Sequence, residues 1–197
     1  MPEYRLSPAP ALEPEAADHI EVGGNGIEEN RNIAIASVAS RSGRGKDVRA
    51  VLRQILKCDA PEAGAFVVGE DHAAFWMGPD QWMILAEHEN HELLASELKE
   101  RLGETASVTE QNDGWVCLDV TGDKLPAVFE RLTAADVWKL ESGSAVRTVV
   151  EHIGCFLICV EQDRHYRLLA GRSFAKSFHH AILTALGSTL LLYPDRK

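Results

Sequence analysis

Short apolar runs separated by turn-forming residues dominate the stretch from Gly64 to Ala86. The runs are rich in β-branched and aromatic residues, and they occupy positions 66–68, 75–77 and 82–85. Gly69-Glu70-Asp71 and Gly78-Pro79-Asp80 stand between them, and both triplets are typical of tight turns. The pattern therefore predicts an antiparallel hairpin or meander around which the rest of the chain is organised.

Helical periodicity appears on both sides of this meander. A strand candidate at 33–38 precedes a helix that starts from Asp47 as its N-cap, and a second helix with a leucine stripe ends at Gly103. The same order returns later in the chain. Its members are a strand at 115–120, a helix over 125–132, strands at 145–150, 153–160 and 166–170, a helix from Ser173 to Gly187, and a closing strand at 189–193.

The repeated order of elements predicts the fold class. We expect an α+β fold in which a strand–helix–three strands–helix unit is duplicated and builds antiparallel sheets. The single domain should span residues 31–193, with halves at about 31–105 and 106–193. Residues 1–30 contain four prolines and a Gly23-Gly24-Asn25-Gly26 cluster without apolar periodicity. They predict an extended or disordered N-terminal arm.

Composition narrows the classes of function. The chain has 30 acidic and 20 basic residues, a net charge of −10, which weighs against a nucleic-acid partner. Its longest apolar run, 155–160, is far too short for a membrane span, and the first residues lack a secretory leader pattern. The four cysteines at 58, 117, 155 and 159 fall inside strand or helix patterns. They are typical of reduced core residues in a cytoplasmic protein.

Two groups of residues are candidates for contact with a partner protein. Trp76 and Trp82 flank the Gly-Pro turn, and each is either core filler or an exposed anchor. The basic turn that contains Arg41, Arg44 and Lys46 either contacts an acidic partner or is simply solvated. It is not a phosphate-binding P-loop, because Ser40 and Asp47 replace the glycine and hydroxyl residue that such a loop requires.

No pattern predicts a catalytic, cofactor-binding or metal site. His88 and His91 form an H-x2-H pair, but a second pair that would complete four metal ligands is missing. A solvated, acidic helix start explains the pair better. The chain also lacks a Gly-x-Ser-x-Gly nucleophile elbow, and Cys155 and Cys159 share one strand face with Leu157, as core residues do.

Several longer motifs carry a family resemblance. They are Gly78-Pro79-Asp80-Gln81-Trp82, the segment 107–115, His152-Ile153-Gly154 and Arg172-Ser173-Phe174-Ala175. From about Ile33 to Leu186 the chain resembles the γ subunit of heterotetrameric sarcosine oxidase. That family is similar in fold to the folate-binding domain of aminomethyltransferases, and the segment 132–140 resembles a motif of those enzymes. Cys155-Phe156 replaces the acidic pair that the resemblance would place there, so the catalytic chemistry is expected to be lost.

The resemblance implies a non-catalytic γ subunit that stabilises the flavin-bearing β subunit of the complex. Such a complex oxidises sarcosine to glycine, with formaldehyde or methylenetetrahydrofolate and hydrogen peroxide as further products. FAD, FMN, NAD, zinc and tetrahydrofolate are expected on the partner subunits and not on this chain. The alternatives are a free-standing tetrahydrofolate-binding or aminomethyltransferase-like protein and a self-associating structural domain.

Overall fold

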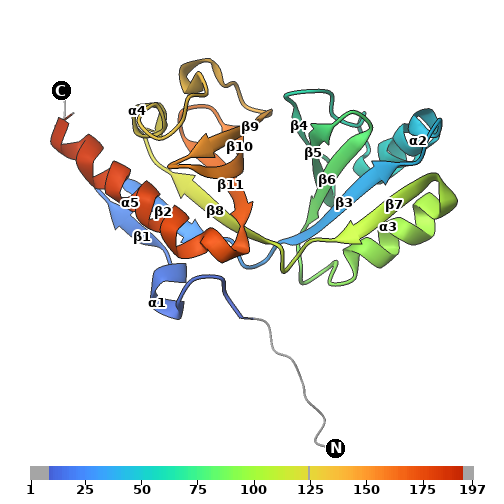
Figure 1. Ribbon diagram of the computed structural model, residues 1–197, viewed down its shortest axis with the longest axis horizontal. Coiled ribbons are helices and arrows are strands. Elements are labelled where there is room, and N and C mark those ends of the chain that lie inside the picture. The colour runs from blue at the N-terminus through green and yellow to red at the C-terminus, as the bar shows by residue number, and fades with distance from the viewer. Residues whose placement is uncertain (1–8, 124, 193–197) are drawn as a thin grey trace, which may run out of the picture.

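Two antiparallel β-sheets make up the body of the protein (Figure 1). The computed structural model describes residues 9–123 and 125–192. One sheet has five strands, in the spatial order β4 (Phe66–Val68), β5 (His72–Gly78), β6 (Gln81–Ala86), β3 (Ala34–Ser40) and β7 (Ala106–Glu110). The other has six, in the order β9 (Ser144–Val150), β10 (Ile153–Glu161), β11 (His165–Gly171), β8 (Trp115–Thr121), β2 (Asn25–Glu29) and β1 (Ile20–Val22). The predicted meander is confirmed as β4, β5 and β6.

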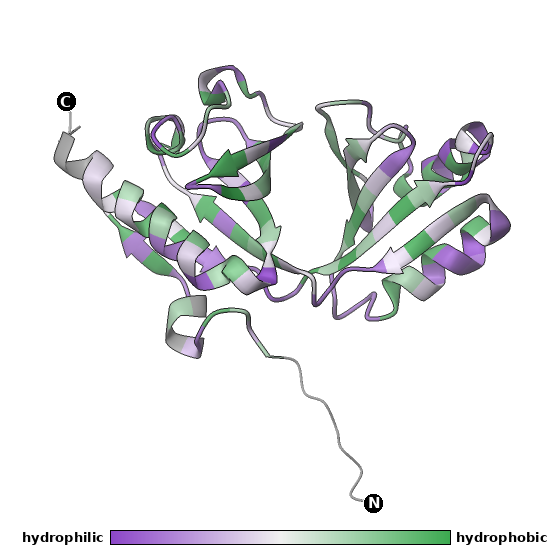
Figure 2. Ribbon diagram, viewed as in Figure 1, coloured by the Kyte–Doolittle hydropathy of each residue, from purple (hydrophilic) through white to green (hydrophobic). Residues whose placement is uncertain are grey.

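Two amphipathic helices cover the outer face of the five-stranded sheet. Helix α2 (Gly45–Leu56) begins two residues before the expected cap at Asp47 and buries the predicted apolar stripe. Helix α3 (Leu94–Leu102) buries its leucines and ends at Gly103, as expected. Both helices pack on the alanines, Trp82 and Ile84 of the sheet, and Figure 2 shows hydrophilic residues along their solvent-facing sides.

The outer face of the six-stranded sheet is covered differently. Helix α4 (Leu125–Phe129) is a short turn of helix followed by the 3₁₀ segment η2 (Val137–Lys139), whereas η3 (Arg172–Phe174) leads into the 18-residue helix α5 (Ala175–Leu192). Their apolar residues form one core with the sheet, and Phe129 lies edge-on to Tyr166 at 5.2 Å. Among the described residues, no helix is both long and apolar enough to cross a membrane.

The end of helix α5 corrects the sequence-based expectation. The helix passes through Gly187 and reaches Leu192, so the predicted stop at Gly187 and the closing strand from 189 are wrong, while Tyr193 lies outside the described residues. A glycine costs a helix only about 1 kcal/mol relative to alanine. Packing outweighs that cost here, because Leu186 and Thr189, on either side of Gly187, are both buried.

The duplicated order of elements is confirmed. The first unit runs β3, α2, β4, β5, β6, α3 and the second runs β8, α4, β9, β10, β11, α5. The two sheets also match in space, since β4-β5-β6-β3-β7 corresponds strand by strand to β9-β10-β11-β8-β2. The small 3₁₀ helix η1 (Gly103–Thr105) and the N-terminal turn α1 (Pro14–Ala17) lie outside the repeated units.

The strands at one end of each sheet cross the predicted boundaries. Strand β7 follows residue 105 in sequence, yet it pairs with β3 of the first unit. Strands β1 and β2 fall inside the expected arm, yet β2 pairs with β8 of the second unit. The arm is therefore wrong for residues 20–29, where Gly23 and Gly24 adopt positive φ and close a tight hairpin.

A third core lies between the inner faces of the two sheets. It joins Phe75, Met83 and Leu85 to Phe156 and Ile158, and the rings of Phe75 and Phe156 are 4.8 Å apart. At one corner the sheets are also joined by backbone hydrogen bonds, from Phe66 to Gly143 at 2.7 Å and from Ala145 to Gly64 at 2.9 Å. The sheets are therefore packed against each other as parts of one folded unit.

Candidate functional site

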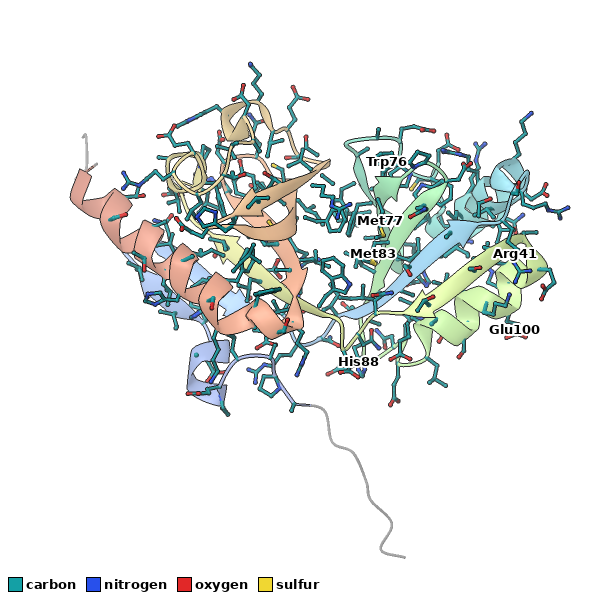
Figure 3. All side chains as sticks on the ribbon, viewed as in Figure 1. Arg41, Trp76, Met77, Met83, His88 and Glu100 are labelled. Atoms are coloured by element: carbon teal, nitrogen blue, oxygen red, sulfur yellow. The ribbon has the colours of Figure 1, made fainter. Side chains whose placement is uncertain are left out.

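The two candidate tryptophans lie in different environments. Trp82 is fully buried against α2, its Nε1 donates to the carbonyl of Pro61 at 2.9 Å, and the guanidinium of Arg49 lies 4.9 Å from its ring. It is core filler and presents no surface to a partner. Trp76, opposite Trp82 on β5, is only half-buried and lies near the top of the five-stranded half in the view of Figure 3.

The basic turn before α2 is exposed. Arg41 forms an ion pair with Glu104 at 3.2 Å, and Arg44 forms one with Asp47 at 2.8 Å. Lys46 is exposed as well. The predicted contact residues other than Trp82 therefore all lie in the half of the molecule that is built on the five-stranded sheet.

A polar cluster that sequence reasoning missed lies on the inner face of the six-stranded sheet. Asp119 on β8 accepts two hydrogen bonds from Arg167 on β11, at 2.8 and 2.9 Å. His165 lies 2.9 Å from its Oδ1, and the amide of Asn30 donates to its Oδ2 at 2.9 Å. A charged residue inside the apolar run of β8 was the available signal, because carboxylates are rarely buried without a partner.

The hydrogen bonds determine the charge state of this cluster. Burial alone would raise the pKa of Asp119, but the hydrogen bonds from His165 and Arg167 outweigh it and hold the pKa well below its usual range. Burial would lower the pKa of Arg167, and the hydrogen bond to Asp119 outweighs that effect. Asp119 is therefore a fixed anion with its oxygens occupied, which is unsuited to accept a proton near neutral pH.

A surface pocket of ≈ 340 Å³ lies beside this cluster. Arg167 and Asn30 form part of one wall, and the β4–β5 turn and the end of β6 form the others. Three exposed acids, Glu70, Asp71 and Glu87, also line the pocket. Since the guanidinium of Arg167 already binds Asp119, the pocket favours a cation or a neutral ligand over an anion.

The expected replacement of acids at Cys155-Phe156 has a structural role. Phe156 fills the core between the sheets, where it contacts Phe75 and Trp115. Cys155 and Cys159 face the opposite side with Leu157, as predicted. Burial raises the pKa of Cys155 to about 12 and that of Cys159 to about 11. Neither thiol is therefore a ready nucleophile at neutral pH.

The structure brings His91 to a partner that its sequence spacing did not suggest. The ring of His91, in the loop before α3, lies 4.5 Å from the ring of His72 at the start of β5, and its Nδ1 is 2.9 Å from Glu97. Burial, followed by the neighbouring His91, lowers the pKa of His72. His88, the expected partner of His91, is not part of this group.

Comparisons with known proteins identify the family. A family model described as "Sarcosine oxidase, gamma subunit family" matches residues 44–186. The chain belongs to this family. No curated protein sequence gives a significant match.

Solved structures agree on the fold of this sarcosine oxidase γ-subunit family member. A chain of the heterotetrameric sarcosine oxidase from Corynebacterium sp. U-96, in complex with pyrrole 2-carboxylate, has a TM-score of 0.72 at 23% identity, covering 89% of this chain and 90% of that one. The glycine cleavage system aminomethyltransferase T from Bartonella henselae has a TM-score of 0.59 at 13% identity, over 81% of this chain and 45% of that one. The predicted similarity to an aminomethyltransferase-like fold is confirmed.

The motifs that carry the family resemblance lie at turns and crossings. Gly78–Trp82 forms the β5–β6 turn, in which Asp80 adopts φ 53° and its carbonyl accepts from Ser40 at 3.0 Å. Asn112 lies where the chain crosses from β7 to β8, and its Oδ1 accepts from the backbone of Ile35 at 2.6 Å. Arg172, at the start of η3, donates to the carbonyl of Ala9 at 2.6 Å. In this family member the motif residues hold the fold together.

Proposed function

We propose that this chain is a non-catalytic γ subunit of a heterotetrameric sarcosine oxidase and that it stabilises the flavin-bearing β subunit. The observation that carries the proposal is the family match over residues 44–186. The complex would oxidise sarcosine to glycine, with hydrogen peroxide and formaldehyde or methylenetetrahydrofolate as the other products. FAD, FMN, NAD, zinc and tetrahydrofolate would be bound by the partner subunits.

The side chains of the inner sheet faces support a structural role. Asp119 is engaged by Arg167, His165 and Asn30, so its carboxylate has no free position for a reacting group. Phe156 occupies the place where the related transferases are expected to carry an acid. A fixed, internally paired anion and an aromatic core stabilise a scaffold but supply no general acid or base.

Surface contact with a partner would use exposed side chains of the five-stranded half. The proposed contacts are Trp76 and the basic turn of Arg41, Arg44 and Lys46. Trp82 cannot contact a partner, because it is buried. A partner with an acidic surface would complement this turn. Trp138, which is 57% exposed, is a matched tryptophan on the opposite half.

Co-purification from the native cell tests the proposal. An affinity-tagged full chain should retain a flavoprotein whose preparation forms hydrogen peroxide when sarcosine is added. Trp76→Ala and the triple Arg41/Arg44/Lys46→Ala variant should each weaken assembly by about 30-fold, the equivalent of about 2 kcal/mol. Trp138→Ala should leave assembly unchanged. A tagged, folded chain that retains no flavoprotein would contradict the proposed function, whereas normal assembly of both contact variants would contradict only the contacts.

A free-standing tetrahydrofolate-binding protein is the second candidate. The pocket of ≈ 340 Å³ and the aminomethyltransferase-like fold favour it. The acids Glu70, Asp71 and Glu87 at the pocket oppose it, because folates carry carboxylates of the same sign. Calorimetric titration of the isolated chain with millimolar tetrahydrofolate decides between the two. Saturable heat would favour this candidate, and the absence of heat would exclude it.

A further inference from the structure

We propose that His72, His91 and Glu97 form a binding site for a late first-row divalent metal ion, of the Zn²⁺ type, that clips the β6–α3 loop onto the start of β5. The three residues come from a strand, a loop and the first turn of a helix. The site lies on the helix-covered side of the five-stranded sheet. It is independent of the proposed subunit role.

The geometry of the three side chains is close to that of a metal centre. One ligand atom from each residue lies within 4.8 Å of the other two, and His91 Nδ1 is already 2.9 Å from Glu97 Oε2. Zinc binds nitrogen and oxygen at about 2.0–2.2 Å in a tetrahedral arrangement, so two ligand atoms on one ion lie about 3.4 Å apart. A side-chain rotation that shortens the longest of these separations by about 1.4 Å would bring the three atoms to that spacing. Glu97, whose side chain is 45% exposed, is free to make it.

The histidine at the centre of the group has an unsatisfied ring nitrogen. His72 Nδ1 is shielded from solvent and has no hydrogen-bond partner among the described residues. The neighbouring ring of His91 lies at 4.5 Å and is tilted by 51°. Buried polar atoms in native proteins almost always have a partner. An ion bound by one nitrogen of each imidazole would fix the two ring orientations, and binding through His72 Nδ1 would give that atom its missing partner.

Surrounding charges favour entry of a cation. Asp71 precedes His72, and the loop around His91 carries Glu87, Glu89 and Glu92. Among the charges that act on His72, Asp71 and Glu97 favour a positive charge there, and His91 and Arg101 oppose it. The side chain of His91 is 19% exposed, so the site is open to solvent.

The ligand set selects the class of metal. Two imidazoles and a carboxylate suit zinc and its neighbours in the first transition row, whereas magnesium and calcium prefer oxygen ligands only. Three protein ligands leave a coordination position for water, so the site would be open rather than fully enclosed. Its role would be to hold the β6–α3 loop in place, because that loop otherwise reaches the sheet mainly through Asn32, which accepts from the backbone of His88 at 3.4 Å and of Glu89 at 3.0 Å.

Calorimetric titration of the chelator-treated full chain with ZnCl₂ tests the site. We expect one bound ion per chain and a thermal midpoint that rises with zinc but not with the same concentration of MgCl₂. His91→Ala and Glu97→Gln should weaken zinc binding by about 100-fold or more, since even outer-shell changes cost 10–100-fold. His88→Ala is the matched control from the same loop and should bind zinc as the unaltered chain does.

Each result of this titration bears on the site. Circular dichroism of each variant first establishes that it is folded. Absence of saturable zinc binding to the folded chain would overturn the proposal. Zinc binding that survives both His91→Ala and Glu97→Gln would do so too, because the ion would then be bound elsewhere.

Discussion

The five-stranded and six-stranded sheets share one strand order, yet their inner faces differ. On the five-stranded sheet the buried side chains that face the other sheet are apolar, as Phe75 and Met83 illustrate. On the six-stranded sheet the corresponding face carries Asp119 and Arg167 next to Cys117 and Leu169. One copy of the repeated unit therefore supplies only a packing surface, while the other also retains a buried, fully paired charge.

The helices that cover the two sheets also differ, and those on the five-stranded sheet are the more regular. The five-stranded sheet is covered by two regular amphipathic helices of 12 and 9 residues. The six-stranded sheet is covered by one helix of 18 residues and one of only 5. Duplication has thus preserved the sheet topology more strictly than the elements that cover it, because strand pairing depends on backbone hydrogen bonds that most side chains tolerate.

The largest change in unfolding free energy is expected for a variant that removes part of the apolar core between the two sheets. Phe156→Ala should lower the free energy of unfolding by about 4 kcal/mol, since it removes a buried ring that packs on Phe75 and Trp115. Urea unfolding measures the change. Phe174→Ala, at a ring that is 54% exposed, is the control and should change stability by less than about 0.5 kcal/mol. Equal effects of the two variants would show that the inner core does not hold the sheets together.

The next effect separates the two inner faces. Arg167→Met should cost about 3 kcal/mol of unfolding free energy, because it leaves the buried carboxylate of Asp119 without its strongest partner. Arg164→Met, which breaks the exposed pair with Asp123, should cost no more than about 0.5 kcal/mol.

A double-mutant cycle sharpens this result. The loss in Arg167→Met combined with Asp119→Asn should be smaller than the sum of the two single losses by about 1 kcal/mol or more. Strict additivity would mean that the pair contributes no mutual stabilisation.

The smallest effect concerns pH. The pKa of Asp119 is depressed in the folded chain, so its contribution is complete above the unfolded pKa of about 3.9 and is lost as the pH falls toward the folded value. Stability of the unaltered chain should therefore decrease more steeply below about pH 4 than that of Asp119→Asn. Urea midpoints between pH 2.5 and 6 measure both slopes. Parallel curves would indicate that the hydrogen bonds to Asp119 do not favour its ionised form.

Much of the fold was predictable because local patterns and final structure agree. The apolar runs at 66–68, 75–77 and 82–85 became β4, β5 and β6, and the leucine stripe before Gly103 became α3. The strands at β1, β2 and β7 were missed, since they are short and contain few large apolar residues. Strand β7 pairs with β3 and β2 pairs with β8, both distant in sequence, and β1 pairs with β2.

The sequence by itself determined the repeated order of strands and helices, the burial of Cys117, Cys155 and Cys159 and the family, because each depends on residue type and local spacing, whereas Cys58 is only partly buried. Only the tertiary structure decided that Trp82 is buried, that β7 and β2 extend the sheets of the opposite halves, and that Asp119 meets Arg167. It likewise brought His72 to His91. These contacts join residues far apart along the chain, and the pairing of strands that are distant in sequence decides which of them meet.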